Sequence, residues 1–108
     1  MIKKVTAAML NALASNREWR LKATSTHRGE RGMLVRLHEN LIAVILPDSV
    51  EFCAQGHATA TTVERMNAIA QAYCNAAIGR RKGRIVATVD GQPAGDFAAT
   101  DRFTLPRT

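Results

Sequence analysis

The sequence predicts an α+β fold, in which an antiparallel β-meander carries two helices on one face and ends in a C-terminal β-hairpin. Three observations predict it. Residues 3–15 and 61–78 place apolar side chains three and four residues apart, as one buried face of a helix requires. Between them, apolar and polar residues alternate over short runs separated by turn residues, as in successive antiparallel strands. Asp90-Gly91, beyond the second helix, is a hairpin-turn signal.

The first elements follow from a change of period. Residues 3–15 are rich in alanine and predict a helix that stops at Ser15-Asn16. From Glu18 to Thr24 apolar and polar residues alternate, which predicts a first strand with Trp19 in the core. Residues 26–32 are polar and contain two glycines, so we expect a mobile connection with exposed charges.

Three further strands and a second helix are expected next. The strands cover residues 33–38, 41–46 and 50–55, and Glu39-Asn40 provides the turn between the first two. Thr61 and Glu64 have the spacing of a capping box, in which a hydroxyl and a carboxylate bind free amides at a helix start. The helix then runs to about Ile78, and Gly79 ends it.

The C-terminal third predicts a basic loop and a closing hairpin. Residues 79–84 form the loop, and residues 85–89 and 92–97 form the hairpin, with Phe103 and Leu105 packing over an edge. We expect one domain over 1–108, composed of an N-terminal helix at 1–16, a sheet plus helix at 17–105 and a loose tail at 106–108.

Length and composition exclude several classes of protein. A chain of 108 residues, 46% of them hydrophobic, is too short for a multidomain enzyme and is not compositionally disordered. No apolar run approaches the roughly 20 residues of a membrane-spanning helix, and the N-terminus lacks a signal-peptide core. We therefore expect a cytoplasmic protein with no membrane partner.

The cysteines and histidines indicate neither a metal site nor a cofactor. Cys53 and Cys74 are too far apart for a paired motif, and the three histidines are scattered without zinc-ligand spacing. Both cysteines look like core residues, and a disulfide between them is disfavoured in the cytoplasm.

The net charge of +6 is unevenly distributed along the chain. Residues 1–36 carry +6, residues 37–64 carry −4, residues 65–84 carry +5 and residues 85–108 carry −1. Two basic stretches that meet on one face would form a phosphate-binding surface, whereas two that lie apart would mainly confer solubility.

A basic cluster near residue 80 is the strongest functional signal. Four cations fall within five positions, on a loop whose glycines permit close approach of a ligand. Ordinary solvated loop charge is the alternative interpretation. With the early basic residues, the candidate nucleic-acid contacts are Arg80, Arg81, Lys82, Arg84, Arg17, Arg20, Lys22, Arg28 and Arg31.

A weaker anion site is suggested by His57, Thr61 and Thr62, which precede or open the second helix. Free amides and the helix dipole bind anions there, although helix capping alone also explains the threonines. Arg65 follows, and we expect it to contact a phosphate or to form an internal salt bridge with Glu51 or Glu39.

Catalytic chemistry is not indicated. His38 and Glu39 are adjacent, and neighbouring residues of a strand point to opposite faces, so a structural role is favoured for them. The sequence contains no nucleophile elbow, phosphate loop, dinucleotide fingerprint or paired-carboxylate arrangement. We expect a protein that is not an enzyme.

Short motifs connect the chain with one class of proteins. Leu37-His38, Ile42-Ala43 and the run from Thr61-Thr62 through Arg65 to Asn67 resemble a diffuse class of small phage and prophage proteins, and the similarity extends over residues 33–105. His57 stands where that class usually has tryptophan, and Arg102 where it commonly has glycine. The resemblance implies a mobile-element origin and a fold rather than a mechanism.

Two function hypotheses follow. The first is a phage or prophage accessory protein that binds nucleic acid non-enzymatically through its basic surface. The second is a protein-binding inhibitor or modulator of a host defence or nucleic-acid-processing complex, in which the acidic stretch at 37–64 meets a basic host protein. A homodimer paired through exposed strand edges is compatible with both.

Overall fold

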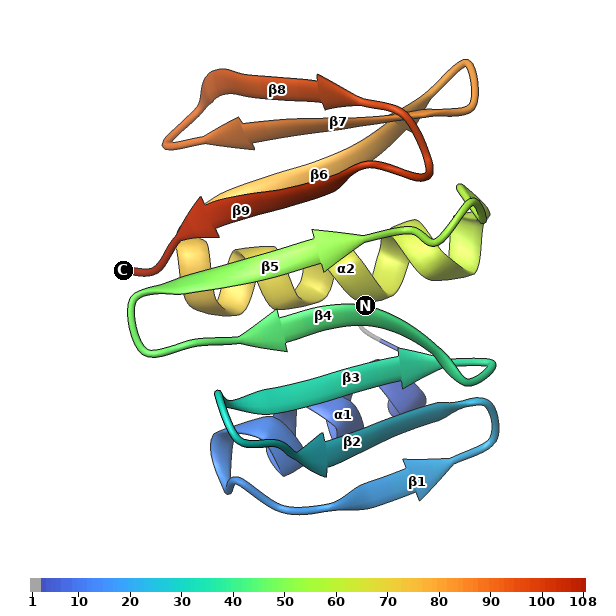
Figure 1. Ribbon diagram of the computed structural model, residues 1–108, viewed down its shortest axis with the longest axis vertical. Helices are drawn as coiled ribbons and strands as arrows, with labels where there is room; N and C mark the ends of the chain where they lie inside the picture. The colour runs from blue at the N-terminus through green and yellow to red at the C-terminus, as the bar shows by residue number, and fades with distance from the viewer. Residues whose placement is uncertain (1–2) are drawn as a thin grey trace.

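The structure, a computed structural model, describes residues 3–108 and has two helices and nine strands in this range (Figure 1). The helices lie behind the larger of two antiparallel sheets. In chain order, the elements are α1 (Lys4–Ala14), β1 (Trp19–Leu21), β2 (Thr24–Arg28), β3 (Met33–Leu37), β4 (Asn40–Ile45), β5 (Ser49–Cys53), α2 (Ala60–Cys74), β6 (Ala76–Arg81), β7 (Arg84–Val89), β8 (Gln92–Phe97) and β9 (Arg102–Pro106).

The sheet order confirms the predicted α+β class. Six strands follow the order β1-β2-β3-β4-β5-β9, so the expected meander runs from β1 to β5 and the last strand of the chain joins its edge. The remaining strands form a second sheet in the order β6-β7-β8, in which β7 and β8 form the predicted hairpin around Asp90-Gly91. The second sheet lies beyond β9 along the longest axis of the molecule.

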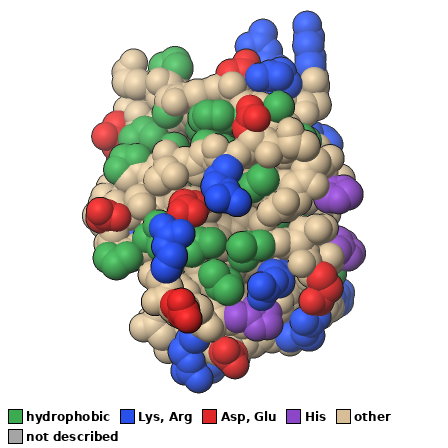
Figure 2. All heavy atoms as spheres, in the orientation of Figure 1, with side chains coloured by type: hydrophobic (Ala, Val, Ile, Leu, Met, Phe, Trp, Pro, Cys, Tyr) green, Lys and Arg blue, Asp and Glu red, His purple; other side chains and the backbone are tan. Residues whose placement is uncertain are grey.

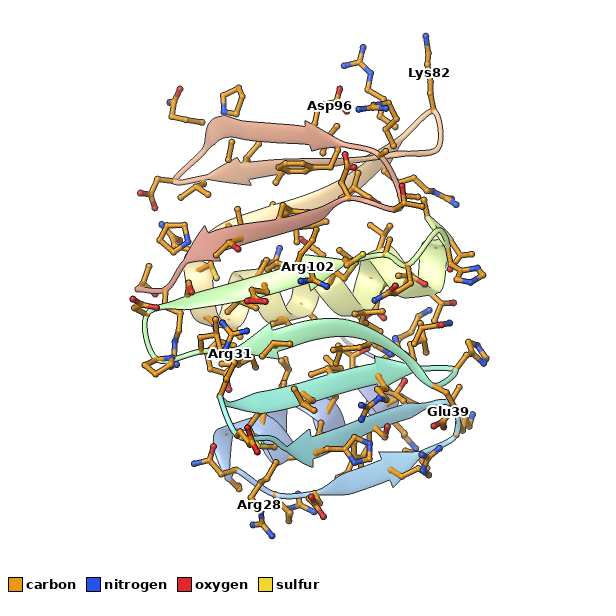
Figure 3. The ribbon with its side chains drawn as sticks, in the orientation of Figure 1. Arg28, Arg31, Glu39, Lys82, Asp96 and Arg102 are labelled. Carbon is orange, nitrogen blue, oxygen red and sulfur yellow. The ribbon has the colours of Figure 1, made fainter. Side chains whose placement is uncertain are left out.

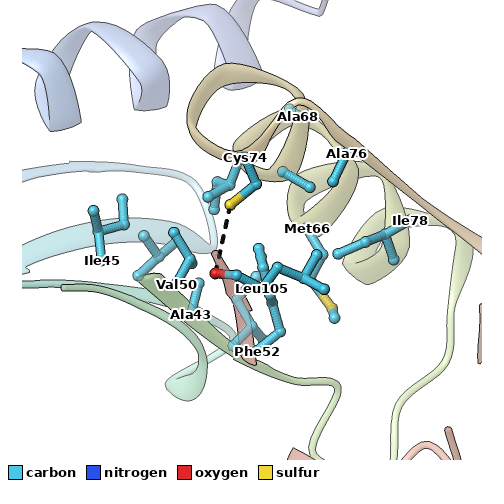
Figure 4. Close-up of a cluster of buried hydrophobic side chains, with 14 of the residues drawn as sticks. Ala43, Ile45, Val50, Phe52, Met66, Ala68, Cys74, Ala76, Ile78 and Leu105 are labelled. Atoms are coloured by element: carbon cyan, nitrogen blue, oxygen red, sulfur yellow. Dashed lines mark hydrogen bonds between the residues drawn. The ribbon is translucent and has the colours of Figure 1, made fainter. Parts of the chain in front are cut away.

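The core lies between the large sheet and the helices. Alternate residues of β3 and β5 are buried on the helix-facing side, among them Val35, Val50 and Phe52. They meet a stripe of α2 that contains Met66 and Ile69, which the helical spacing predicts (Figure 4). Burial of this apolar surface is the main force that holds the helices on the sheet.

Three phenylalanines connect the two sheets. The ring of Phe103 in β9 stacks on Phe52 of β5 at a centroid distance of 5.5 Å and on Phe97 of β8 at 4.2 Å. Gly95 provides room for this stack, because a Cβ atom there would lie 2.2 Å from the Phe97 ring. The small sheet is therefore packed onto the edge of the large one through aromatic contacts.

The first strand differs from its prediction. Lys22 has a φ of 55°, and this left-handed residue turns the chain after Leu21, so residues 18–24 do not form a single strand. The polar segment at 26–32 is not a mobile connection, since its first part completes β2. The Thr26 hydroxyl is buried and donates to the Arg17 carbonyl oxygen, which explains how a polar sequence forms an inner strand.

The second helix is shorter than predicted. It ends at Cys74 because Asn75 adopts a left-handed conformation, with φ 47° and ψ 46°. Ile78 therefore lies in β6, where its backbone N–H donates to the Asn67 side-chain oxygen at 2.9 Å. Gly79 is a strand residue opposite Val86 and has no capping role.

Smaller differences concern turns and ends. The turn between β3 and β4 is made by His38 and Glu39, both with positive φ, one residue earlier than expected. The expected capping box is wrong, because Thr59 is the N-cap of α2 and its hydroxyl oxygen accepts from the Thr62 N–H. Cys53 is only partly buried, whereas Cys74 is in the core as predicted, and both thiols are free.

The last residues are not a loose tail. Pro106 belongs to β9, and the backbone N–H of Arg107 donates to the Asp48 carbonyl at 3.0 Å. The N–H of Thr108 donates to the Tyr73 carbonyl at 2.9 Å. These bonds hold the chain end against the β4–β5 turn and the end of α2.

Neither helix of residues 3–108 is long and apolar enough to cross a membrane.

Candidate nucleic-acid interface

The β6–β7 hairpin carries the strongest cluster of cations. Its turn is made by Lys82 and Gly83, whose φ values of 51° and 76° match the paired left-handed residues of a tight hairpin turn. Arg81 faces Arg84 across this turn. Figures 2 and 3 show basic side chains at this tip, with Lys82 pointing away from the body of the molecule. The predicted loop is therefore the end of a two-stranded ribbon.

The four cations at this tip differ in their partners. Arg84 forms an ion pair with Asp96 at 2.7 Å, and an Arg80 side-chain nitrogen donates to the Ala58 carbonyl at 3.2 Å. Within the described residues, Arg81 and Lys82 have no ion-pair partner and no side-chain hydrogen bond. Both are exposed, so their charges are available to an anionic partner.

Most of the early basic residues lie at the other end of the molecule, whereas Arg31 lies nearer its middle, beside β5. Arg20 and Lys22 lie on β1 and the turn that follows it, and β1 is the strand of the large sheet farthest from β9. Figure 3 shows Arg28 at the bottom of the view and Lys82 at the top. The two basic stretches of the sequence therefore do not converge on one surface.

Several early cations are also paired or bound. Arg20 lies 3.0 Å from the Glu39 carboxylate, and Arg31 lies 3.2 Å from that of Glu51. A side-chain nitrogen of Arg28 donates to the Asn16 carbonyl at 3.3 Å. Arg17 and Lys22 are exposed. The positive potential is consequently less concentrated here than at the β6–β7 hairpin.

The three predicted residues of the weaker anion site line one small hollow at the start of α2, but they differ in exposure. Thr62 is buried, and its hydroxyl oxygen accepts a hydrogen bond from Thr59, so it serves the start of α2. His57 and Thr61 are exposed at the same helix end. The bond from Arg80 to Ala58 brings the tip of the β6–β7 hairpin beside this helix end.

Arg65 has an interior role that the sequence did not reveal. Its guanidinium is buried and pairs with the adjacent Glu64, not with Glu51 or Glu39. It also donates to the hydroxyl of Thr6 in α1 at 3.0 Å and to that of Thr24 in β2 at 3.3 Å. Arg65 therefore connects two helices and a strand, and is not a candidate phosphate contact.

The acidic stretch at 37–64 does not form one surface. Glu39 and Asp48 lie in different turns, Glu51 points out from β5 and Glu64 is part of the interior network. No group of three His, Cys, Asp or Glu side chains in residues 3–108 is arranged to hold a metal ion.

Sequence reasoning missed the roles of two arginines near the large sheet, Arg102 and Arg107. Arg102 projects from the open face of β9, as Figure 3 shows. Arg107 places its guanidinium 5.1 Å from the centre of the Tyr73 ring. Only the pairing of β9 with β5 brings these residues to the sheet, and no local pattern in the sequence signals that pairing.

A comparison with protein families assigns the chain. Residues 2–104 match the family model of the Kyanoviridae Gp96 protein. The chain belongs to this family. Kyanoviridae Gp96 proteins are phage proteins, which confirms the expected phage class, while the short motifs that suggested it remain a prediction. No curated protein and no solved structure matches the chain. The part that matches the Kyanoviridae Gp96 family includes the whole β6–β7 hairpin.

Proposed function

We propose that this phage protein binds nucleic acid non-enzymatically, and that the tip of the β6–β7 hairpin makes the principal contact. The observation that carries the proposal is the gathering of four exposed cations at this tip, of which only Arg84 has a carboxylate partner within the described residues. Neutralisation of phosphates by such cations releases counterions, which is the main source of affinity in non-specific binding.

The shape of the hairpin supports the same proposal. A two-stranded β-ribbon fits into the major groove of duplex DNA. Here the tip projects beyond Ile85, the residue of β7 nearest the tip that pairs with β8, and its cations are the last two residues of β6, the turn residue Lys82 and the first residue of β7. The neighbouring end of α2 adds His57 and its free N-terminal amides, which favour negative charge. A phosphate backbone that crosses the tip would meet both features.

The proposed contact includes fewer basic residues than the set that the sequence suggested. Arg80, Arg81, Lys82 and Arg84 are the proposed contacts. The early basic residues contribute only long-range attraction, because most of them lie at the other end of the molecule and part of their charge is balanced by Glu39 and Glu51.

The test is fluorescence anisotropy with labelled duplex DNA, single-stranded DNA and RNA, each with wild-type protein and two double variants. Arg81→Gln/Lys82→Asn removes the unpaired charges at the tip, and asparagine tolerates the left-handed backbone at that turn. Arg20→Gln/Lys22→Asn is the matched control, since it removes two charges at the β1–β2 turn and Lys22 also has a positive φ.

We expect micromolar binding at low salt, weakened about tenfold by the hairpin variant and much less by the control. Absence of binding to all three nucleic acids would overturn the proposal. Equal losses of affinity in the two variants would show that the β6–β7 hairpin is not the principal contact.

A further inference from the structure

A groove away from the β6–β7 hairpin has the composition of a ligand site. It lies between the end of α1, the β2–β3 turn, the β4–β5 turn and the chain end, and its volume is about 590 Å³. This volume lies within the range of about 300–1,000 Å³ found for small-molecule sites. Arg28 and Arg31 reach it from the end of β2 and the β2–β3 turn, and Arg107 from the chain end, and no Asp or Glu lines it. We name it the arginine groove.

The backbone that carries Arg28 and Arg31 is fixed. The N–H of Gly29 donates to the Gly32 carbonyl at 2.9 Å and closes the turn. Gly32 packs directly on β4, because a Cβ atom there would lie 1.9 Å from the Ile45 carbonyl oxygen. The rim of the groove is therefore formed before any ligand arrives, which reduces the entropy cost of binding.

The third arginine is also held in position. A side-chain nitrogen of Arg107 donates to the Leu46 carbonyl at 2.8 Å, while its guanidinium lies over the ring of Tyr73. A guanidinium has five N–H donors in a planar arrangement, so this contact leaves donors for a carboxylate, sulfonate or phosphate. The Arg31 side chain is 69% exposed and pairs with Glu51 through one terminal nitrogen.

The rest of the lining is apolar and neutral. Leu13, Met33 and Ile45 provide aliphatic surface, and Tyr73 provides an aromatic ring. Burial raises the pKa of the Tyr73 phenol, and the nearby Arg107 lowers it by less, so the phenol is uncharged near neutral pH and does not repel an anion. The groove thus combines apolar surface with cationic donors.

We propose that the arginine groove binds a small organic anion, with the acidic group on the arginines and the apolar part against Leu13, Met33 and Tyr73. This site is independent of the proposed nucleic-acid contact, since none of the residues of the β6–β7 hairpin lines it. Two classes of molecule share this chemistry: nucleotides and amphiphilic carboxylates.

The test uses 8-anilinonaphthalene-1-sulfonate, an aromatic sulfonate whose fluorescence rises in an apolar site. The probe is titrated into wild-type protein and into the variants Arg31→Gln, Arg107→Gln and Arg81→Gln. Arg31→Gln alters an exposed side chain and should not affect folding, whereas Arg81→Gln is a charge-matched control on the β6–β7 hairpin.

The expected result is one saturable site, weakened about tenfold in Arg31→Gln and Arg107→Gln and unchanged in Arg81→Gln. Competition then separates the sources, because displacement by adenosine monophosphate indicates a nucleotide site and displacement by octanoate a carboxylate site. Non-saturable binding, equal binding in all variants, or displacement by neither competitor would overturn the proposal.

Discussion

At the scale of single residues, the most consequential side chain is the buried guanidinium of Arg65. It pairs with Glu64 and donates to Thr6 and Thr24, so it satisfies polar groups from α1, α2 and β2. Its position in the sequence suggested a phosphate contact or an internal salt bridge with Glu51 or Glu39. The misplacement arose because Arg65 lies on the buried side of α2, where two buried hydroxyls and a partly buried carboxylate offset its desolvation.

We predict that Arg65→Met lowers the free energy of unfolding by about 3 kcal/mol, since a partly buried carboxylate and two hydroxyls lose their partner. Urea denaturation measures this. Arg20→Ala, which breaks the exposed pair with Glu39, should cost less than about 1 kcal/mol and serves as the control. A comparable, small effect of both substitutions would contradict the role assigned to the buried network.

Two neighbouring residues give the stability a pH dependence. Burial raises the pKa of Tyr73 and Cys74 above their ordinary values of 10.0 and 9.0, and Arg107 lowers both by less. The unfolded chain therefore loses these protons first as the pH rises. Their contribution to stability is fully present below pH 9 and is lost as the pH rises through the folded-state pKa values.

The prediction is a lower free energy of unfolding at pH 10.5 than at pH 8, measured in urea. Tyr73→Phe keeps the ring below Arg107 but removes the phenol, so its loss of stability over the same range should be smaller. An identical pH dependence in wild type and variant would refute the assignment to Tyr73.

The burial of Cys74 should make its thiol less reactive than that of Cys53. Cys74 is in the core, with its thiol 3.9 Å from the Leu105 carbonyl, whereas Cys53 is partly exposed on β5. In native protein at pH 8, iodoacetamide should therefore modify Cys53 first and Cys74 only on unfolding. Peptide mass spectrometry identifies the modified residue, and faster labelling of Cys74 would be inconsistent with this core.

At the scale of elements, the sequence predicted both helices and most strands but misplaced several ends. The apolar periods of α1, β3, β5 and α2 are strong because each of these elements buries one face. The missed ends at Lys22 and Asn75 are non-glycine residues in left-handed conformations. No local signal marks Lys22, whereas asparagine is a helix-end residue whose signal the more usual Gly79 outweighs in the sequence. Strand β2 was missed because its buried side chains are two threonines and a serine, and the hydroxyl partners of the threonines are supplied by other parts of the chain.

The β2–β3 turn shows how one element depends on its neighbour. Gly32→Ala places a Cβ atom 1.9 Å from the Ile45 carbonyl oxygen, so the turn must move away from β4. We predict a loss of about 2 kcal/mol or more in the free energy of unfolding. Gly79→Ala is the matched control, because its Cβ would meet Val86 at an ordinary 3.7 Å and should change stability by less than about 0.5 kcal/mol. Equal effects would show that the turn is not packed as described.

At the scale of the whole molecule, the arrangement of charge could not be read from the sequence. The cations of the β6–β7 hairpin could be grouped from the sequence, because they are close to one another along the chain. The early basic residues remained candidate contacts for the same surface until the sheet order placed β1 at one end and the second sheet at the other. Likewise, the arginine groove depends on Arg107, which only the pairing of β9 with β5 brings to the rest of the groove.

The most direct test of the central claim is the salt dependence of binding to duplex DNA. The slope of log K against log salt concentration counts the phosphates that the protein neutralises, at about 0.9 per phosphate. The account predicts that Arg81→Gln/Lys82→Asn reduces the magnitude of this slope by about 2, while Arg20→Gln/Lys22→Asn changes it little. A slope that both variants reduce equally, or that neither changes, would contradict the assignment of the β6–β7 hairpin as the nucleic-acid contact.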